Sequence, residues 1–443
     1  MPSRRQFLNV SLATTAAAAA GRLPTLAGDE SPAVIANVPM RPLTAGPNFH
    51  WFGYYDKEQV SADGRLALSN EVTFEGRSPT ADDTIDVGTV DLTAADPATT
   101  WTPIGQSSAW GWQQGCMLQW RPGHPSEVIW NDREGSGGDA RFVARIHNVV
   151  TGQTRTIPHA IYALSPDGRF GVTTDFNRIQ NMRPGYGYAG VLDPNEDRKA
   201  PSETGLRRVD LDTGESTLLV SYADMAALPH GGQSLADKWH YFNHLLVDPT
   251  GERMIFLHRW RNSPARRSDD PEFEPAAGGF STRLVTCRCD DGSDRYLLDP
   301  SGSTSHFIWR DPEHICAWTR HRGDWGFWLF RDRTGEVLPV GAHVMDRNGH
   351  NTYVPGTEGT WILNDTYPFK THRRQQVYLY HVPSNRKFIL GEFHSPERYT
   401  GEVRCDTHPR NSRDGKTVII DSPHGGGRQM YELEIGELIA RQS

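Results

Sequence analysis

The sequence has few of the features that mark disulfide-rich, membrane-spanning or serine-hydrolase proteins. It contains five cysteines in 443 residues, an odd number that leaves at least one thiol unpaired, and their spacing matches no zinc framework. Beyond the N-terminal segment no stretch is apolar enough to span a bilayer. The Gly-x-Ser-x-Gly motif that positions the nucleophile of α/β-hydrolases is also absent. We therefore expect structural cysteines and a chemistry that depends on other residue types.

Basic residues are fewer than acidic ones, 46 against 54. The formal net charge is −8, and the first 27 residues contain three arginines and no acid, so the remainder carries −11. An acidic surface argues against nucleic acid as a partner, because the phosphate backbone is bound through lysine and arginine. An anionic ligand would need a local basic pocket.

The N-terminus has the composition of a targeting segment. Paired Arg4 and Arg5 precede Phe7 and Leu8, and an uncharged run follows to Ala20. This run is shorter than the roughly 20 residues that a membrane span requires, and small residues at 25–27 fit a cleavage site. We interpret residues 1–27 as a twin-arginine signal peptide, which predicts a periplasmic or secreted protein.

Turns are abundant, with 43 glycines, 30 prolines and 10% aromatic residues. A pattern of apolar strand, Ser-Pro-Asp-Gly-like turn and second apolar strand recurs seven times, about 45–60 residues apart with one longer gap. The turns lie at 61–64, 121–123, 165–168, 248–251, 310–312, 354–356 and 412–415. Because such turns join antiparallel neighbours, the repeat predicts an all-β fold, a seven-bladed β-propeller of four-stranded antiparallel blades over residues 33–438.

Two insertions and the ring closure can also be located. Residues 181–203 interrupt the third blade, and residues 261–279 form a second insertion in the fourth; long insertions of this kind are often functional loops. The last blade reaches only a third strand near the C-terminus. We expect residues 33–38 to supply its fourth strand, because an open sheet edge invites aggregation.

Histidines occupy one repeated position. Five residues before the second turn residue, blades four to seven have His244, His306, His350 and His408, whereas the first three blades have Lys57, Met117 and Ile161. Strand alternation predicts that the four share one orientation and converge at one mouth of the central channel. A histidine cluster is typical of a metal or acid–base site, and imidazole suits Mn, Fe, Zn, Ni and Cu. His240, four residues before His244, is expected to face the same side farther out.

Other side chains are expected around this mouth. Asp406 precedes His408 by two residues and could be a carboxylate ligand. An arginine can hold a carboxylate with two hydrogen bonds, and exposed aromatic rings suit stacking on sugars. The candidates for substrate binding are Arg259, Trp260, Tyr367, Arg404, Arg428 and Gln429.

Here the sequence resembles a known family. His244 to Pro249, the run 256–260, His306 to Trp309, and His408-Pro409 before the last turn are similar to the oligogalacturonate lyases, polysaccharide lyase family 22. Those enzymes are seven-bladed propellers related to the Tol-system propellers. The resemblance is best between residues 238 and 431.

The resemblance implies a reaction and a set of roles. The histidine at the position of His244 is the Brønsted base in that family, and a divalent metal, usually manganese, is bound by histidines at the positions of His306 and His408. This sequence departs from the pattern, with Val403 at a glutamine position and Asp406 at a histidine position. The implied function is metal-dependent β-elimination on a uronate-containing oligosaccharide such as a pectin fragment, with His350 and Asp406 completing the metal site and Arg259 holding a carboxylate.

Two other classes stay open. A glycoside hydrolase on the same fold would need two carboxylates across the mouth, for which the sequence offers Asp56, Asp132, Asp175 and Asp365. A non-catalytic propeller that binds a glycan or a protein would contain no metal.

Overall fold

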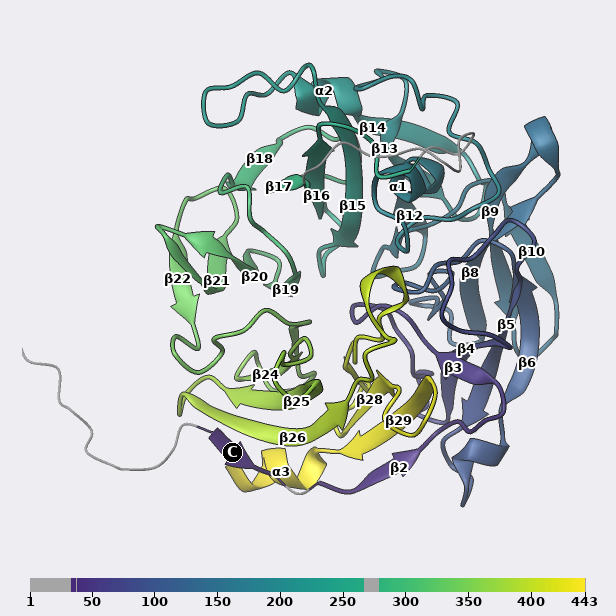
Figure 1. The fold of residues 1–443 in the computed structure, drawn as a ribbon, viewed down its shortest axis with the longest axis vertical. Helices are drawn as coiled ribbons and strands as arrows, with labels where there is room; N and C mark the ends of the chain where they lie inside the picture. Colours follow the sequence, from purple (N-terminus) through teal and green to yellow (C-terminus); the bar gives the residue numbers. More distant parts are fainter. Residues whose placement is uncertain (1–32, 37, 267–278, 443) are drawn as a thin grey trace, which may run out of the picture. The chain divides into compact units, whose positions relative to one another are not determined.

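Seven antiparallel sheets follow one another along the chain and are arranged around a common axis (Figure 1). The computed structural model describes residues 33–36, 38–266 and 279–442. The predicted signal peptide at 1–27 and most of the insertion in the fourth blade lie outside the described residues. Within the described part of the chain, no helix has the length and apolarity needed to cross a membrane.

In the first six blades, four strands follow one another from the innermost outward in chain order. The first three blades comprise β3 (Phe49–Trp51), β4 (Leu66–Val72), β5 (Ile85–Asp91) and β6 (Thr102–Ser107); β7 (Gln119–Trp120), β8 (Glu127–Glu134), β9 (Arg141–Asn148) and β10 (Thr154–Ile157); and β11 (Ala163–Leu164), β12 (Phe170–Thr173), β13 (Gly205–Asp210) and β14 (Ser216–Ser221). The next three comprise β15 (Trp239–Val247), β16 (Arg253–Arg261), β17 (Ser281–Arg288) and β18 (Tyr296–Asp299); β19 (Phe307–Asp311), β20 (His314–His321), β21 (Asp324–Arg331) and β22 (Val337–Val340); and β23 (Thr352–Tyr353), β24 (Trp361–Asp365), β25 (Arg374–His381) and β26 (Arg386–His394). The seventh has β27 (Arg410–Asn411), β28 (Thr417–Ser422) and β29 (Gln429–Glu434). The predicted seven-bladed propeller is confirmed.

Ring closure uses different residues from those expected. The fourth strand of the seventh blade is β2 (Met40–Pro42), which pairs antiparallel with β29. The segment predicted for this role contains β1 (Ala33–Ile35), which instead pairs parallel with β26 on the outer edge of the sixth blade. An N-terminal strand does close the ring, as predicted, but it is β2 rather than residues 33–38. The sequence could not distinguish the two segments, because such short strands pair through main-chain hydrogen bonds that almost any residues can form.

The repeated turn has a clear local cause. In the third blade the Ser165 hydroxyl donates to Asp167 at 2.7 Å, and the amide of Gly168 donates to the Ser165 carbonyl at 2.9 Å. Gly168 has φ of +66°, a left-handed conformation that glycine adopts without penalty. The same serine–aspartate bond recurs in the first and seventh blades, from Ser61 and from Ser412. Local chemistry therefore fixes each hairpin and, through it, the direction of every inner strand.

The core lies between neighbouring sheets. On β16, Ile255 and Leu257 pack with the fifth blade, whereas Met254 and Phe256 pack with the third. Alternate residues of a strand face opposite sides, so a strand covered on both faces needs a continuous apolar run. This two-sided burial holds the inner strands in place around the axis.

Three short helices complete the described structure: α1 (Phe176–Met182), α2 (Tyr222–Ala226) and α3 (Gly436–Gln442). The α1 helix opens the insertion of the third blade, between β12 and β13. Because β12 runs away from the hairpin turn, this insertion leaves the blade at the end opposite the turns. The insertion of the fourth blade, after β16, leaves at the same end.

Candidate functional site

The four histidines in register do converge. The ring centroids of His306 and His350 lie 4.2 Å apart, and those of His350 and His408 lie 4.3 Å apart. The His244 ring is linked to this group through Tyr54, whose centroid lies 5.0 Å from that of His244 and 5.2 Å from that of His408. All four imidazoles are buried. The predicted cluster at the axis of the ring is thus present.

Strand alternation is not what orients them. His306, His350 and His408 precede β19, β23 and β27, so they lie in loops rather than in the strands. His244 lies within β15 but has φ of +52°, and His408 has φ of +37°. A left-handed conformation is strained for a non-glycine residue, and such strain collects at functional sites.

His240 does not face the cluster, contrary to the expectation. Its Nδ1 lies 2.8 Å from Nε2 of His258, and its own Nε2 bonds the Leu235 carbonyl at 2.9 Å. The register between β15 and β16 shifts between Asn243 and Leu246, and this irregularity breaks the alternation that the prediction assumed.

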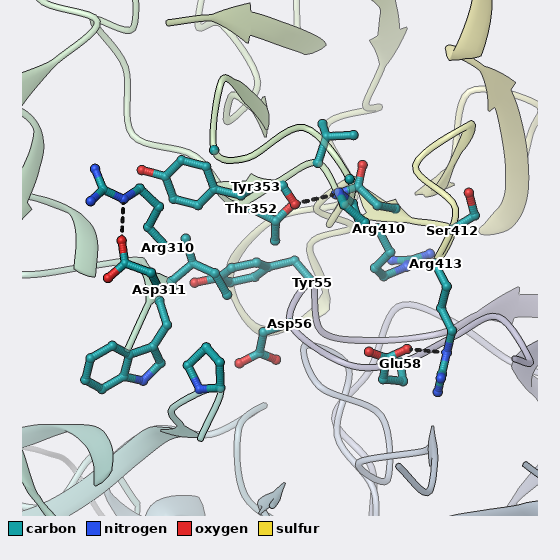
Figure 2. A pocket seen from close by; sticks show the side chains of 18 of the residues that line it. Tyr55, Asp56, Glu58, Arg310, Asp311, Thr352, Tyr353, Arg410, Ser412 and Arg413 are labelled. Carbon is teal, nitrogen blue, oxygen red and sulfur yellow. Dashed lines mark hydrogen bonds and ion pairs between the residues drawn. The ribbon is translucent and has the colours of Figure 1, made fainter. Parts of the chain in front are cut away.

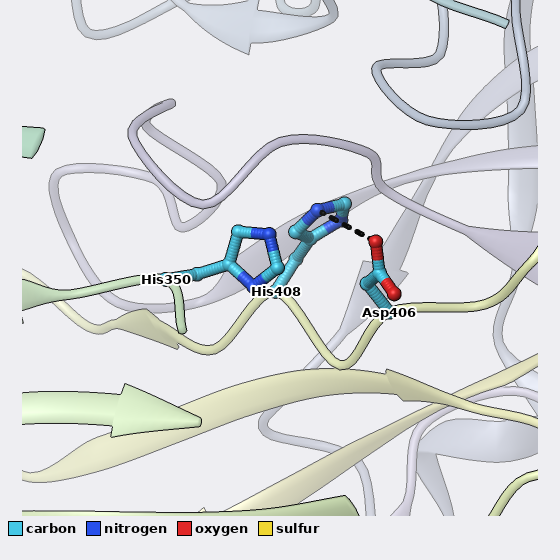
Figure 3. Close-up of side chains that lie close together, drawn as sticks. All are labelled: His350, Asp406 and His408. Carbon is cyan, nitrogen blue, oxygen red and sulfur yellow. Dashed lines mark ion pairs between the residues drawn. The ribbon is translucent and has the colours of Figure 1, made fainter. Parts of the chain in front are cut away.

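Three of the predicted metal ligands could share one ion. His350, Asp406 and His408 each offer a donor atom, and these atoms lie within 4.8 Å of one another (Figure 3). Nε2 of His408 is buried without a hydrogen-bond partner among the described residues. A buried imidazole nitrogen left unpaired is costly unless something binds it. The donor set of imidazole and carboxylate fits a divalent ion such as Mn, Fe or Zn.

Hydrogen bonds fix two of these rings for ligation. Nδ1 of His350 lies 2.9 Å from Oδ1 of Asp365, and Nδ1 of His306 lies 2.9 Å from Oδ1 of Asn348. A metal-binding histidine usually donates its other ring N–H to an oxygen in this way. Both rings therefore present Nε2 away from this bond; Nε2 of His306 lies 3.5 Å from the Tyr367 hydroxyl, and His306 lies beside the three-residue group rather than within it.

Burial also keeps the His306 and His408 rings neutral, which is the form that binds metal. It lowers the pKa of His306 and of His408 well below the ordinary value, and neighbouring imidazoles add to the effect on each. Arg404 holds the carboxylate, since its Nε donates to Oδ2 of Asp406 at 2.7 Å. The same guanidinium donates to the Tyr186 hydroxyl at 2.5 Å. Arg404 therefore orients Asp406 rather than standing free for a substrate.

The first blade contributes to the site, which the sequence analysis missed. Tyr54 and Tyr55 follow β3 and pack their rings against the histidines, and Asp56 and Lys57 follow in turn. Asp56 had been considered only as half of a glycosidase pair, and Lys57 had been counted as an ordinary residue. The sequence signal that could have identified them is the run Tyr-Tyr-Asp-Lys, which ends at the position that histidine occupies in blades four to seven. The chemical part of the ring therefore extends beyond blades four to seven.

His244 lies in a distinct setting. Its Nε2 lies 3.2 Å from Oδ2 of Asp56, and its backbone N–H donates to the Tyr162 hydroxyl at 2.7 Å. Its ring stacks on Phe307 with centroids 4.0 Å apart. Burial lowers the pKa of His244 to about 4, although Asp56 opposes this shift. The ring is thus neutral at neutral pH and can accept a proton.

Arg259 is a buried cation that has no counter-ion among the described residues. Its side chain is 3% exposed, and Nε and Nη1 have no hydrogen-bond partner in the described part of the chain. Burial lowers the pKa of its guanidinium to about 10, and the neighbouring Arg183 adds to the shift. Arg183 comes from the insertion of the third blade, and both guanidinium groups pack on the Phe280 ring, at 4.9 and 4.3 Å. Two cations at one mouth are suited to an anionic ligand.

Tyr367 also lies at the cluster, with its ring centroid 5.7 Å from that of His350. Trp260 does not, because it is 6% exposed and packs against His230 and His258 on the opposite face of β16 from Arg259. The expectation of an exposed stacking surface there is wrong, since one residue along a strand reverses the facing.

Arg428 and Gln429 are held by the scaffold. Arg428 donates to Glu75 at 3.3 Å and to the Val403 carbonyl at 2.9 Å. The Gln429 amide donates to the Asn48 carbonyl at 2.8 Å. The predicted role in substrate binding is not supported by these contacts, which join the seventh blade to the first.

Two of the four candidate glycosidase carboxylates lie elsewhere. Asp132 pairs with Arg145 at 2.9 Å, and Asp175 accepts from the Thr204 hydroxyl at 2.7 Å. The other two are at the cluster, where each is bonded to a histidine. None of these carboxylates is arranged as a free pair across the mouth.

A cavity of about 810 Å³ opens on the side of the hairpin turns (Figure 2). Tyr55, Asp56 and Lys57 are among its lining residues, with turn residues such as Pro249, Pro355 and Ser412. The third-blade insertion, by contrast, leaves its blade at the opposite end. The histidine cluster is therefore bounded by Tyr55 and Asp56 on one side and by Tyr186 and Arg404 on the other.

Comparisons with known proteins agree with the fold. No family model matches the chain. The Tol-Pal system protein TolB of Gluconobacter oxydans (strain 621H) is 26% identical over 188 residues, and the match spans 38% of this chain and 39% of that protein. An oligogalacturonate lyase from Vibrio parahaemolyticus has a TM-score of 0.59 at 13% identity, covering 90% of this chain and 94% of that one. An oligogalacturonate lyase in complex with manganese has the same score and identity and covers 91% and 94%. The predicted resemblance is confirmed at the level of the fold.

Proposed function

We propose that this chain, on a propeller fold shared with the oligogalacturonate lyases, is a metal-dependent enzyme that cleaves uronate-containing oligosaccharides by β-elimination. The observation that carries the proposal is a division of roles within one buried cluster. His350, Asp406 and His408 offer converging ligand atoms, whereas His244 is neutral and bonded to a carboxylate. The manganese in the second lyase structure supports a divalent ion of this kind.

The chemistry needs a base and a way to stabilise negative charge. The proton at C5 of a uronate is weakly acidic, and its removal places charge on the adjacent carboxylate. The C4–O bond then breaks as the C4=C5 double bond forms, and the departing sugar hydroxyl takes a proton from water. His244 would take this proton, because a neutral imidazole within hydrogen-bond reach is a suitable base. A divalent ion bound by His350, Asp406 and His408, with His306 beside them, would supply Lewis-acid polarisation of the carboxylate.

The remaining residues would bind and orient the sugar. Arg259 has free N–H groups in a buried site, where a hydrogen bond to a carboxylate is stronger than in water. Arg183 adds a second cation, and Tyr367 offers a hydroxyl beside His306. The predicted twin-arginine segment supports action outside the cytoplasm on such acidic oligosaccharides.

The test is to purify the protein, measure its metal content by elemental analysis, and incubate it with polyuronates and Mn²⁺. We expect about one metal ion per chain and the ultraviolet absorbance of an unsaturated product. His408→Ala should lose both metal and turnover, whereas His244→Gln should keep the metal and lose turnover. A reducing sugar without the unsaturated product would indicate a glycosidase, and a metal-free protein that only binds glycans would indicate a binding propeller.

A further inference from the structure

The hydrogen bonds of His244 differ between its two ring nitrogens. Nε2 lies 3.2 Å from Oδ2 of Asp56 and 3.3 Å from the Tyr55 hydroxyl oxygen. Nδ1 is buried and has no hydrogen-bond partner among the described residues. A neutral imidazole carries one N–H, and its neighbours decide which nitrogen holds it.

Both neighbours of Nε2 are acceptors. The Tyr55 O–H donates to the Phe307 carbonyl at 2.8 Å, so only its oxygen lone pairs face the histidine. An ionised carboxylate accepts and cannot donate. The proton must therefore lie on Nε2 wherever Asp56 is ionised.

Asp56 is held in its ionised form. Its side chain has no exposed surface, and burial alone opposes ionisation. The Lys57 ammonium lies 3.2 Å from Oδ1, and together with the bond from His244 it keeps the pKa of Asp56 below its ordinary value. The charge of Asp56 is thus balanced inside the protein, next to the imidazole.

We propose that Asp56 is the positioning residue of the base: it accepts the Nε2–H of His244 and so leaves the Nδ1 lone pair to take the substrate proton. This assignment rests on the proposed function for its catalytic meaning, but the tautomer itself does not depend on it. The backbone of His244 is fixed independently by Tyr162, and its ring plane by Phe307. Asp56 comes from the first blade and lies 188 residues away in sequence.

Once the base has taken a proton, Asp56 has a second effect. The imidazolium carries N–H groups on both nitrogens, and the carboxylate at 3.2 Å lowers the free energy of that charge. This stabilisation grows as the proton is transferred. Asp56 should therefore affect turnover more than substrate affinity.

The key variant is Asp56→Asn, which keeps the shape but can donate an N–H to Nε2 and so favours the wrong tautomer. We expect kcat to fall by about 10²–10⁴-fold, as with the equivalent change in a serine protease, with KM changed less than threefold. Lys57→Arg is the matched control, since it keeps a cation beside Asp56 and leaves the Asp56–His244 bond in place; it should retain the tautomer. If Asp56→Asn does not fold, Asp56→Asn combined with Lys57→Met leaves no unpaired charge and serves in its place.

The tautomer can be read without any substrate. Solid-state NMR of protein labelled with ¹⁵N-histidine separates protonated from unprotonated ring nitrogens, and a difference spectrum against His244→Gln isolates this residue. We expect Nε2–H in the wild type and Nδ1–H in Asp56→Asn. A wild-type Nδ1–H tautomer, or the same tautomer and kcat in Asp56→Asn, overturns the proposal. Absence of lyase activity together with the expected tautomers would overturn the proposed function instead.

Discussion

Replacing Arg259 by methionine should make the protein more stable and less active at once. Arg259 is buried with no counter-ion among the described residues, and burial lowers the pKa of its guanidinium by about two and a half units, to about 10. Because one pKa unit corresponds to about 1.4 kcal/mol, the charged state costs about 3 kcal/mol in the folded protein. Loss of the packing on Phe280, an interaction worth about 1 kcal/mol, offsets part of this gain. We expect the free energy of unfolding to rise by about 1–2 kcal/mol.

Arg283 provides a matched control on the adjacent strand β17. It is also buried, and burial lowers the pKa of its guanidinium to about 10. Unlike Arg259, it donates to Nδ1 of His258 and to the carbonyls of Met225 and Leu228. Arg283→Met leaves these acceptors unpaired and should lower the free energy of unfolding by about 3–5 kcal/mol.

The two variants are compared by urea unfolding followed by tryptophan fluorescence, together with initial rates on polyuronate. Arg259→Met should lose about 10–100-fold in kcat/KM, the expected effect of removing a charge-assisted hydrogen bond to a carboxylate. Equal destabilisation by the two substitutions, or full turnover in Arg259→Met, would refute the interpretation of Arg259 as a cation held for a substrate anion.

Three further outcomes follow from the same structure. Burial lowers the pKa of His240 and His244 to about 4, so between pH 6.5 and pH 4 the unfolded chain binds protons that the folded chain does not. The free energy of unfolding should therefore be greatest above pH 6.5 and fall by roughly 3 kcal/mol per histidine towards pH 4. Urea unfolding of His240→Gln at a series of pH values should show a smaller fall. On the acid side of the pH–rate profile, kcat/KM should fall with an apparent pKa near 4. A fall with an apparent pKa of 6.5 would contradict a buried neutral base. Trp260→Ala should lower the thermal midpoint and leave KM unchanged, since the Trp260 ring packs on the face of β16 away from the site. A tenfold rise in KM would instead show that Trp260 binds substrate.

The site joins residues whose partners are far apart along the chain. Asp365 orients His350 through a 2.9 Å bond and accepts the Thr407 hydroxyl at 2.5 Å, so the sixth and seventh blades share one network. Asp56 links the first blade to the fourth. A substitution at Asp56 therefore affects a histidine on another blade, whereas one at Asp365 affects His350 of its own blade and Thr407 of the next; double-mutant cycles would measure these couplings.

The predictions that failed share one cause. Trp260 and Arg259 are adjacent, and the sequence did not reveal which of them faces the axis. His240 was assigned by strand alternation, which the irregularity after Asn243 interrupts. Arg428 was treated as a free cation, but Glu75, 353 residues away, pairs with it. Each outcome depends on a contact between segments that no local pattern records.

Sequence by itself determined the features that repeat and that act locally. Seven turns rich in serine, proline, aspartate and glycine marked the hairpins, and the histidines at one offset from these turns identified four blades with chemistry, because turn geometry depends only on neighbouring residues. Tertiary structure alone decided, within the described residues, which nitrogen of His244 lacks a partner, which carboxylates hold the rings of His244 and His350, and that Arg259 keeps unbonded N–H groups. Closing a chain into a ring brings distant blades together at the axis, and hydrogen-bond partners there are set by position in space rather than by order along the chain.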